Sequence, residues 1–514
     1  MSMNLEIKGQ ELQDLDMVSF EGWEEISEPY VYIVRFLTTT DTTTKTLTGK
    51  QVTFDYEVAG LLEQNEPAYV HGYIHGHRIL GLSLDRKFVT ELEIRPRLYK
   101  LSLSGQTQVF GTTSKIKLPD LAKSILSPSS YKEGTSTQGD FSDDREIDCD
   151  MPGDVDQTER SFIVQYRETD LHFLSRIIEN EGIFYFVSND KSKETVQFGD
   201  KNHIFKKIGG KVPYIPQHLV NAAPVEEHVR TVHMRAEIAP KKMYVRDYNP
   251  NEASRRGQYL RNHAVDSNGS GAMVSYYEHY TSTSDGDRYA KIRAEEKIAW
   301  QRVFECETNS TRLRPGYLFT MDTDETKLNG LNQRYLVAGC HVRYSKGLDS
   351  VWVEDGHPFK NEIVCIALPS DATWTFRPKR RAEKPKVAGL IRALVDNDAG
   401  GQEAKLDDNG TYKIRLVEEE STESRLPSGK ASANVRHALP YGGGQDTGFQ
   451  FPLYKGTEVI LACIEGDPDL PVIVGTVANS DNKTVLDGID KALNKNKTNR
   501  IRTRSGITIE LIDG

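Results

Sequence analysis

The first hundred residues alternate short runs of apolar and polar side chains. Residues 30–37 and 91–103 are examples of these runs, and Gly, Thr and charged clusters separate the runs. Alternation with a period of two is typical of a strand with one buried face. Residues 4–100 therefore predict an antiparallel sheet or barrel.

A helical period appears first in residues 169–181. Leu171, Leu174 and Ile178 fall on one stripe, and Gly182 supplies the left-handed residue that ends many helices. Apolar runs on both sides, at 162–166 and 183–187, predict strands. The segment is thus expected to be a compact β-α-β piece in a mainly β chain.

Two further helices are predicted. Pro119 opens a short one over 119–126, and Pro128 prevents its continuation. Residues 287–304 carry a narrow apolar stripe among many charges, which predicts a half-exposed helix.

The clearest linker is residues 377–386, RPKRRAEKPK. It holds six basic residues, one acid and two prolines, which is typical of a solvated spacer. Five strand-like runs follow it, at 387–395, 411–417, 433–439, 458–464 and 472–477. Five strands in about 95 residues favour a small closed barrel of the OB kind.

The C-terminal residues look like a strand that needs partners. Ile507, Ile509 and Leu511 alternate with polar residues, and no partner strand is expected to remain in the chain. Residues 491–504 contain six bases and no acid, and Arg500, Arg502 and Arg504 would share one cationic strand face. An edge strand with one apolar row invites pairing with other copies of itself.

Composition narrows the function classes. The 514 residues include 65 Lys and Arg against 75 Asp and Glu, a net charge of −10 that disfavours nucleic-acid coating. Hydrophobic residues make up only 37%, which suggests that part of the burial occurs between subunits. The N-terminus lacks the pattern of a signal peptide, and no apolar run is long enough to span a membrane.

The sequence contains a few candidate ligand clusters. Asp148, Asp150, Gly153, Val155, Asp156 and Glu159 match positions of a calcium loop, but Pro152 lacks a side-chain oxygen and neither flank is helical. A solvated acidic loop is the preferred interpretation, and calcium binding stays open. His71, His75 and His77 lie close together without a nearby carboxylate or cysteine to complete a metal site, so strand histidines are expected.

No motif specifies catalysis or a cofactor. Gly442–Gly444 lacks the Gly-Lys-Ser/Thr ending of a nucleotide cradle, so a hairpin loop is expected there. The five cysteines are Cys149, Cys306, Cys340, Cys365 and Cys463, an odd and widely spaced set that argues against disulfides or zinc. Asp467 and Asp469, in the turn GDPDLP, are the acids that an envelope hydrolase or glycan-binding protein would use. We expect a protein that is not an enzyme, with no cofactor and no metal.

Two long segments resemble VgrG-type spike proteins of type VI secretion. They are VQYRETDLHFLSRIIENEGIFY at 164–185 and GTEVILACIEGDPDLPVIVGTVAN at 456–479, and weaker similarity covers nearly the whole chain. The sequence departs from many relatives at Thr411, at Val417 and Glu418, and in FPLYKG before Gly456. These departures leave a spike of an extracellular contractile particle or a phage tail as alternatives.

The resemblance implies an architecture. A tail-hub-like region of two β-barrels would occupy 1–376, with an α/β insert around 105–200. A linker at 377–386, an OB-fold domain at 387–480 and a tether at 481–499 would follow. Residues 500–514 would begin a triple-stranded β-helix needle in a homotrimer, with Ile501, Ile507, Ile509 and Leu511 as its contacts. No C-terminal effector domain and no lysozyme domain are expected.

The resemblance also implies a function. The protein would be a puncturing spike on an Hcp-like inner tube, in contact with baseplate proteins, and would carry a PAAR-like tip protein and effectors. It would be cytoplasmic before firing and then exported by the contractile machine, without nucleic-acid binding or stable membrane insertion. A glycan-binding or wall-hydrolysing OB protein is the less favoured alternative.

Overall fold

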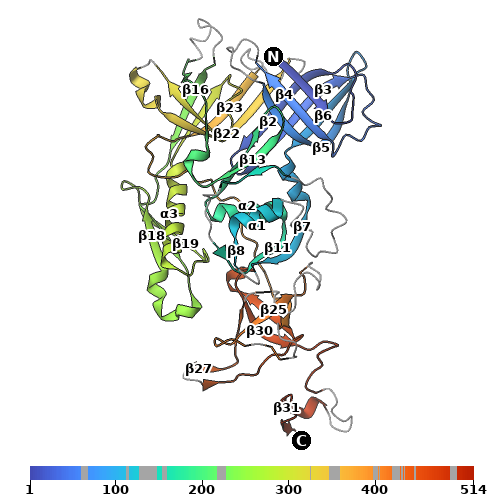
Figure 1. The fold of residues 1–514 in the computed structure, drawn as a ribbon, viewed down its shortest axis with the longest axis vertical. Coiled ribbons are helices and arrows are strands. Elements are labelled where there is room, and N and C mark those ends of the chain that lie inside the picture. Colours follow the sequence, from blue (N-terminus) through green and yellow to red (C-terminus); the bar gives the residue numbers. More distant parts are fainter. Residues whose placement is uncertain are drawn as a thin grey trace. The chain divides into compact units, whose positions relative to one another are not determined.

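A computed structural model resolves the chain into two compact units (Figure 1). Unit 1 comprises Met1–Leu103, Asp143–Gln157 and Leu171–Ala382, and unit 2 comprises Ser104–Ser142, Thr158–Asp170 and Glu383–Gly514. The structure describes all residues except 59–66, 112–114, 127–146, 153–158, 217–226, 324–325, 347–358, 398–402, 405, 420–428, 430–431, 433, 445–446, 487–494 and 514.

The first half of unit 1 is an antiparallel sheet in the order β1-β4-β5-β6-β3-β2. Its strands are β1 (Ser2–Ile7), β2 (Asp16–Glu25), β3 (Glu28–Thr38), β4 (Gln51–Glu57), β5 (Ala68–Leu82) and β6 (Phe88–Arg95). In β3 and β4 every second side chain is buried, which confirms the predicted alternation. The predicted run 91–103 is wrong after Arg95, because Arg97–Leu103 forms a 3-10 helix.

The second half of unit 1 continues the same sheet in the order β22-β23-β20-β16, with β21 beside β22. The strands are β16 (Val229–Ala236), β20 (Arg302–Thr308), β21 (Tyr317–Asp322), β22 (Arg334–Ser345) and β23 (Phe359–Ala367), and the short β14 (Lys206–Lys207) and β15 (Val212–Pro213) pair with β21. Strands β2 and β22 join the halves, and one apolar core contains residues of both halves, from Leu5 to Cys365.

The two halves repeat one five-strand pattern. The order β4-β5-β6-β3-β2 in the first half matches β21-β22-β23-β20-β16 in the second. The bulge between Met17 and Ser19 in β2 has its counterpart between Val229 and Thr231 in β16. The bulge between Ile74 and Gly76 in β5 likewise matches that between Val337 and Gly339 in β22. Because bulges mark specific ladder positions, the match aligns the halves residue by residue.

A smaller sheet and a long helix form a further part of unit 1 with an apolar core of their own. The sheet runs β18-β17-β19, from β18 (Leu260–Ala264), β17 (Lys242–Arg246) and β19 (Ala272–Tyr276), beside the 3-10 helix Pro250–Tyr259. Helix α3 (Thr283–Trp300) begins at the cap of Ser282. The expected half-exposed character is confirmed, because half of its residues are buried, but the helix ends at Trp300 and not near residue 304. Its buried Arg293 pairs with buried Glu278 at 2.5 Å.

Helix α2 (Asp170–Asn180) confirms the predicted β-α-β segment, with β11 (Ile163–Thr169) before it and β12 (Phe184–Asn189) after it. Gly182 has a φ of +72°, as its predicted role at the helix end requires. Strand β12 pairs with β13 (Glu194–Gly199), which also pairs with the short β9 (Cys149–Asp150). In unit 1 the 3-10 turn Asn202–Ile204 and the 3-10 helix Thr326–Leu331 complete the described elements.

Unit 2 contains a closed five-stranded barrel, β24-β25-β26-β30-β29. Its strands confirm the five predicted runs: β24 (Ile391–Asp396), β25 (Thr411–Leu416), β26 (Val435–His437), β29 (Glu458–Cys463) and β30 (Pro471–Val477). The 3-10 turn Ile464–Gly466 lies between the last two strands. The barrel core also includes Val109 of β7 (Gly105–Phe110) and Val164 of β11. Strands β7 and β11 are paired, with Val109 directly opposite Val164.

The rest of unit 2 is made of short elements. Helix α1 (Leu118–Leu126) confirms the predicted helix at 119–126, and β8 (Ile116–Lys117) pairs with β10 (Glu159–Arg160). A small hairpin joins β27 (Gly442–Gly444) to β28 (Thr447–Gly448), and the turn Lys495–Lys497 precedes the last two strands, β31 (Thr498–Arg502) and β32 (Thr508–Ile512).

The basic segment 377–386 is not a solvated spacer throughout. Within unit 1, Arg377 is buried and lies 2.9 Å from Glu295, Arg380 lies 3.3 Å from Glu296, and Arg381 bonds Glu25. The composition could not show these carboxylates, because they come from distant parts of the chain.

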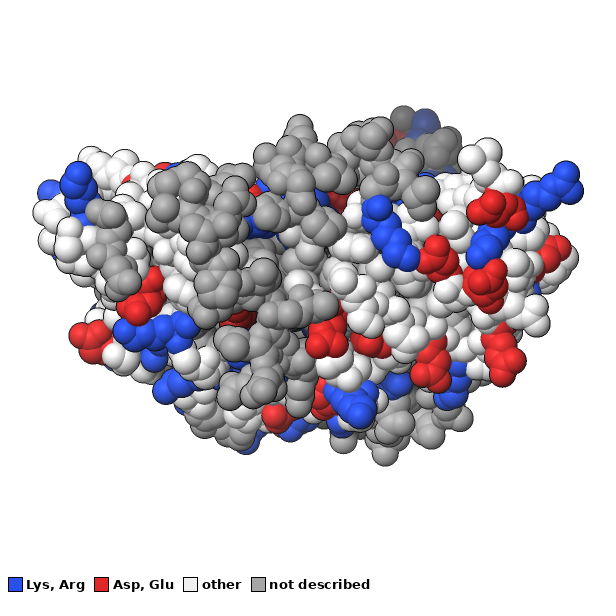
Figure 2. All heavy atoms as spheres, turned by 90° about the horizontal axis from the view of Figure 1, so that it is seen from above, with Lys and Arg blue, Asp and Glu red and all other residues white. Residues whose placement is uncertain are grey.

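Seen from above, acidic and basic side chains of the described residues are interspersed on the visible face (Figure 2).

Candidate functional site at the C-terminal hairpin

The C-terminal strands β31 and β32 form an antiparallel hairpin. Its register pairs Ile501 with Ile509 and Arg500 with Glu510. The turn closes through the Thr503 amide, which donates to the Ile507 carbonyl at 2.9 Å, and Gly506 adopts a φ of +94° that favours glycine. The expectation that the final strand lacks a partner in its own chain is therefore wrong.

The hairpin separates polar from apolar side chains. Arg500 forms an ion pair with Glu510 on one face, and Arg504 lies with its guanidinium 4.8 Å from the ring centre of Tyr454. The purely cationic strand face that the sequence suggested is thus wrong, since Glu510 neutralises part of it. The contact residues expected from the resemblance, Ile501, Ile507, Ile509 and Leu511, expose between 53% and 69% of their surface.

An isolated two-stranded hairpin is marginally stable in water, so these exposed residues have physical consequences. Ile501 and Ile509 are directly opposite each other, and Leu511 falls on the same face by strand alternation. Contiguous exposed aliphatic side chains favour association with another apolar surface. The hairpin is therefore suited to a protein contact, and the needle contacts stay a prediction.

The three candidate histidines serve in local packing. His71 Nδ1 lies 3.0 Å from Thr53 Oγ1, and its Nε2 lies 2.7 Å from the Asp190 carbonyl oxygen. His75 packs edge-on against Tyr99, and partial burial lowers the pKa of His77. Within either unit, the described residues bring no three metal-ligand side chains together.

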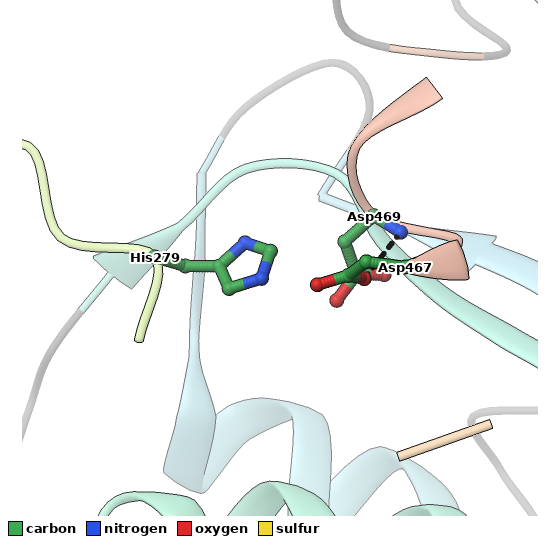
Figure 3. A group of neighbouring side chains, drawn as sticks. All are labelled: His279, Asp467 and Asp469. Atoms are coloured by element: carbon green, nitrogen blue, oxygen red, sulfur yellow. Dashed lines mark hydrogen bonds between the residues drawn. The ribbon is translucent and has the colours of Figure 1, made fainter. Parts of the chain in front are cut away.

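The acids Asp467 and Asp469 hold a turn of unit 2 together (Figure 3). The Asp469 amide donates to Asp467 Oδ1 at 3.0 Å, and Lys384 Nζ lies 2.6 Å from Asp467 Oδ2 and 3.0 Å from Asp469 Oδ2. Asp469 Oδ1 also accepts the Val164 amide at 2.7 Å. Burial, followed by the two acids, raises the pKa of the nearby Cys463 thiol to about 11. These contacts show that both carboxylates stabilise the turn and its neighbours.

The calcium-loop candidates are described only in part, whereas all five cysteines are described. Of the calcium-loop residues, Gly153, Val155 and Asp156 lie outside the described part of the chain, while Asp148 lies 3.7 Å from Lys193. All five cysteines are free thiols. No helix in the described residues has the length and apolar character to cross a membrane.

Sequence reasoning missed a cluster of exposed aromatic residues around β27 and β28. The rings of Tyr441 and Phe449 lie 6.2 Å apart, and Phe449 stacks on Phe451 at 6.5 Å. All three side chains are more than half exposed. The aromatic residues flanking the glycine run were the available signal. The glycine run itself forms part of a hairpin, as the sequence predicts.

Comparison with known proteins gives the family and the fold. The profile of the phage tail baseplate hub (GPD) family matches residues 23–348. The type VI secretion system spike protein VgrG1b of Pseudomonas aeruginosa is 26% identical over 484 residues, which cover 91% of this chain and 59% of that protein. VgrG1c of the same organism is also 26% identical, over 91% of this chain and 60% of its own length.

A third relative carries a different name. The actin cross-linking toxin VgrG1 of Vibrio cholerae is 23% identical over 94% of this chain but only 42% of its own length. The chain thus spans about three fifths of the Pseudomonas relatives and less than half of the toxin. What the other parts of these relatives do is not carried by the matched residues.

Solved structures agree on the architecture. The E. coli c3393 protein, a component of the type VI secretion system, has a TM-score of 0.61 at 19% identity, over 92% of this chain and all of that one. A chain of a Francisella PdpA-VgrG complex has a TM-score of 0.59 at 10% identity, over 99% of this chain and 82% of that one. The mainly β, tail-hub-like fold and the resemblance to VgrG spikes are confirmed, and the chain belongs to the phage tail baseplate hub (GPD) family.

Proposed function

We propose that the protein is a non-enzymatic, homotrimeric puncturing spike of a contractile injection machine of the type VI kind. Family membership supports a place in such a machine, and the exposed apolar face of the C-terminal hairpin is the observation that carries the trimer. Three copies would bury Ile501, Ile507, Ile509 and Leu511 against one another, since burial of each aliphatic side chain stabilises by about 1.5–3 kcal/mol.

The proposal assigns roles to the parts of the chain. The region 1–376 would be the hub on an Hcp-like inner tube and baseplate, joined through 377–386 to an OB-type barrel at 387–480. Residues 481–499 would be the tether, and residues 500–514 would begin a β-helix needle that carries a PAAR-like tip protein and effectors. The protein would be made in the cytoplasm and exported when the machine fires.

The trimer is tested by measuring the mass of the purified protein by light scattering. The unchanged chain is compared with two single variants, which change one residue on opposite faces of the hairpin. We expect three times 58.0 kDa for the unchanged chain, and a smaller species for Ile509→Asp, because a buried charge without a partner is costly. Thr508→Asp changes the opposite face and should stay trimeric. If the unchanged chain is a monomer at micromolar concentration, the proposed homotrimer is wrong.

Puncturing itself needs the machine. In a host whose own spike gene is deleted, we expect the chain to restore release of the inner-tube protein into the medium, and Ile509→Asp to fail. Restoration only in a phage or extracellular particle would favour the alternative subclass. Release of peptidoglycan fragments by the purified chain, lost in Asp467→Ala, would instead support the hydrolase alternative.

A further inference from the structure

The three-stranded sheet β18-β17-β19 packs against α3 with one of its two faces (Figure 1). Met243 and Val245 of β17 are buried, and Val245 shares an apolar core with Tyr289 and Ile292 of α3. Because side chains alternate along a strand, the residues between them point away from α3. The register of the strands places nine residues on this open face: Lys242, Tyr244 and Arg246 of β17, Leu260, Asn262 and Ala264 of β18, and Ala272, Val274 and Tyr276 of β19.

The open face combines apolar side chains with two cations. Leu260, Val274 and Tyr276 expose between 42% and 57% of their surface. Lys242 and Arg246 are exposed as well, and the nine residues include no acid, although the whole chain has a net charge of −10. Such a face favours contact with a surface that is both anionic and apolar.

The acid nearest to this face in sequence does not neutralise it. Asp247 directly follows Arg246, but its carboxylate accepts the amides of Tyr248 at 2.8 Å and Tyr280 at 3.0 Å. Within the described part of the chain, neither Lys242 nor Arg246 forms an ion pair. Both cations are therefore available to an anionic partner.

The chain after β19 holds a further tyrosine beside this face. Tyr277 and His279 adopt φ values of +59° and +64°, a left-handed conformation that is unfavourable for residues other than glycine. The Tyr277 amide donates to the Arg246 carbonyl at 3.1 Å, and the ring centres of Tyr277 and Tyr276 lie 6.4 Å apart. Strained backbone of this kind clusters at functional sites. The conformation therefore supports a function for the two exposed tyrosines.

We propose that the open face of the β18-β17-β19 sheet binds the surface of an anionic lipid bilayer, with Lys242 and Arg246 at lipid phosphates. Leu260, Val274 and Tyr276 then lie at the level of the headgroups, which tyrosine favours because its ring is apolar and its hydroxyl polar. Lys and Arg are attracted to anionic lipid, and their long side chains reach the phosphates. The contact is peripheral and needs no membrane-spanning segment.

A bilayer fits this composition better than an acidic protein surface does, because phosphates and apolar chains occur side by side along the whole bilayer interface. The inference goes beyond the proposed function. It holds for a single copy of the chain, so it does not depend on the homotrimer.

Co-sedimentation of the full chain with lipid vesicles tests the contact. The chain should bind vesicles of phosphatidylcholine that contain about 30% phosphatidylglycerol and should not bind pure phosphatidylcholine. Binding should weaken as sodium chloride is added, because salt screens the surface charges. Each cation near such a surface strengthens binding about fivefold, so the double variant Lys242→Gln, Arg246→Gln should bind about 25-fold more weakly.

Matched controls change the same kinds of side chain elsewhere. The double variant Lys207→Gln, Lys327→Gln removes two exposed cations of unit 1 outside this face and should bind as the unchanged chain does. Tyr276→Ala should weaken binding about threefold or more, whereas Tyr441→Ala, at an exposed tyrosine of unit 2, should not. All four variants change exposed residues, so each should keep the thermal midpoint of the unchanged chain.

Several results would overturn the membrane contact. They are equal binding to neutral and anionic vesicles, unchanged binding in Lys242→Gln, Arg246→Gln, or an equal loss in the Lys207→Gln, Lys327→Gln control. Binding of soluble polyglutamate through Lys242 and Arg246, without binding to vesicles, would favour an acidic protein partner and would also overturn it. A monomeric chain that binds anionic vesicles through this face would contradict the homotrimer and leave the membrane contact standing.

Discussion

Glu194 is a buried acid that connects several elements of unit 1. Its carboxylate accepts the Arg97 amide at 2.7 Å and the Tyr30 hydroxyl at 3.1 Å, and the same hydroxyl bonds the His71 carbonyl. Burial raises the pKa of Glu194 to about 7, although both hydrogen bonds favour the charged form. A carboxyl that ionises near neutral pH makes the stability of this region depend on pH.

We predict that Glu194→Gln removes a pH dependence. The raised pKa means that folded Glu194 holds a proton between pH 4.5 and about 7 while the unfolded chain does not. Its stabilising contribution is present at low pH and is lost as the pH rises through this window, by at most about 3 kcal/mol. The free energy of unfolding, measured in urea from pH 5 to pH 8, should fall more steeply for the unchanged chain than for the variant.

The control for this measurement is Glu6→Gln, which changes an exposed carboxyl on β1. It should follow the unchanged chain at every pH. Parallel curves for the unchanged chain and Glu194→Gln would show that the buried carboxyl does not titrate in this range.

At the scale of elements, the turn that contains Asp469 binds β11 to the barrel of unit 2 through a hydrogen bond. Asp469 accepts the Val164 amide and contacts Lys384, while Val164 and Ile473 belong to one apolar core. Strand β11 and the barrel, far apart in sequence, thus share an apolar core and the hydrogen bond from the Val164 amide to Asp469. This arrangement explains why the turn acids are better placed for structure than for hydrolysis.

Asp469→Ala should destabilise unit 2 by about 1–3 kcal/mol, because it removes the carboxylate that accepts the Val164 amide and one of the two carboxylates at Lys384. The measurement is hydrogen exchange of β11 and the barrel strands in increasing urea. The exposed Asp408→Ala is the matched control and should have no effect. Unchanged amide protection of β11 and the barrel strands in Asp469→Ala would contradict this structural role of Asp469.

At the scale of the whole molecule, assembly should be visible in stability. Association stabilises the native chain and not the unfolded one, so the thermal midpoint should rise by about 2 °C for a hundredfold increase in protein concentration. Ile509→Asp should show a smaller rise by scanning calorimetry. A midpoint independent of concentration in the unchanged chain would contradict an assembly that dissociates on unfolding.

Local patterns determined much of this molecule. The 3.6-residue stripe of α2 with Gly182 at its end, and the five alternating runs of the barrel, follow from side-chain periodicity and turn residues alone. The apolar row of Ile507, Ile509 and Leu511 also follows from simple alternation, and these side chains are exposed. Their needle contacts stay a prediction from the resemblance. Such features need only neighbours in sequence, which is why they could be predicted.

Other features depend on residues far apart in the chain. The partner of β32 is set by the turn at Gly506, and the charges of α3 and of Arg377 are buried because carboxylates from distant segments meet them. The repeat of unit 1 is visible only in strand order and matched bulges, since backbone pairing does not require similar side chains. The sequence alone determined which segments become strands and helices; only the tertiary structure decided which edges meet and which stay open, because pairing is a long-range property of the backbone.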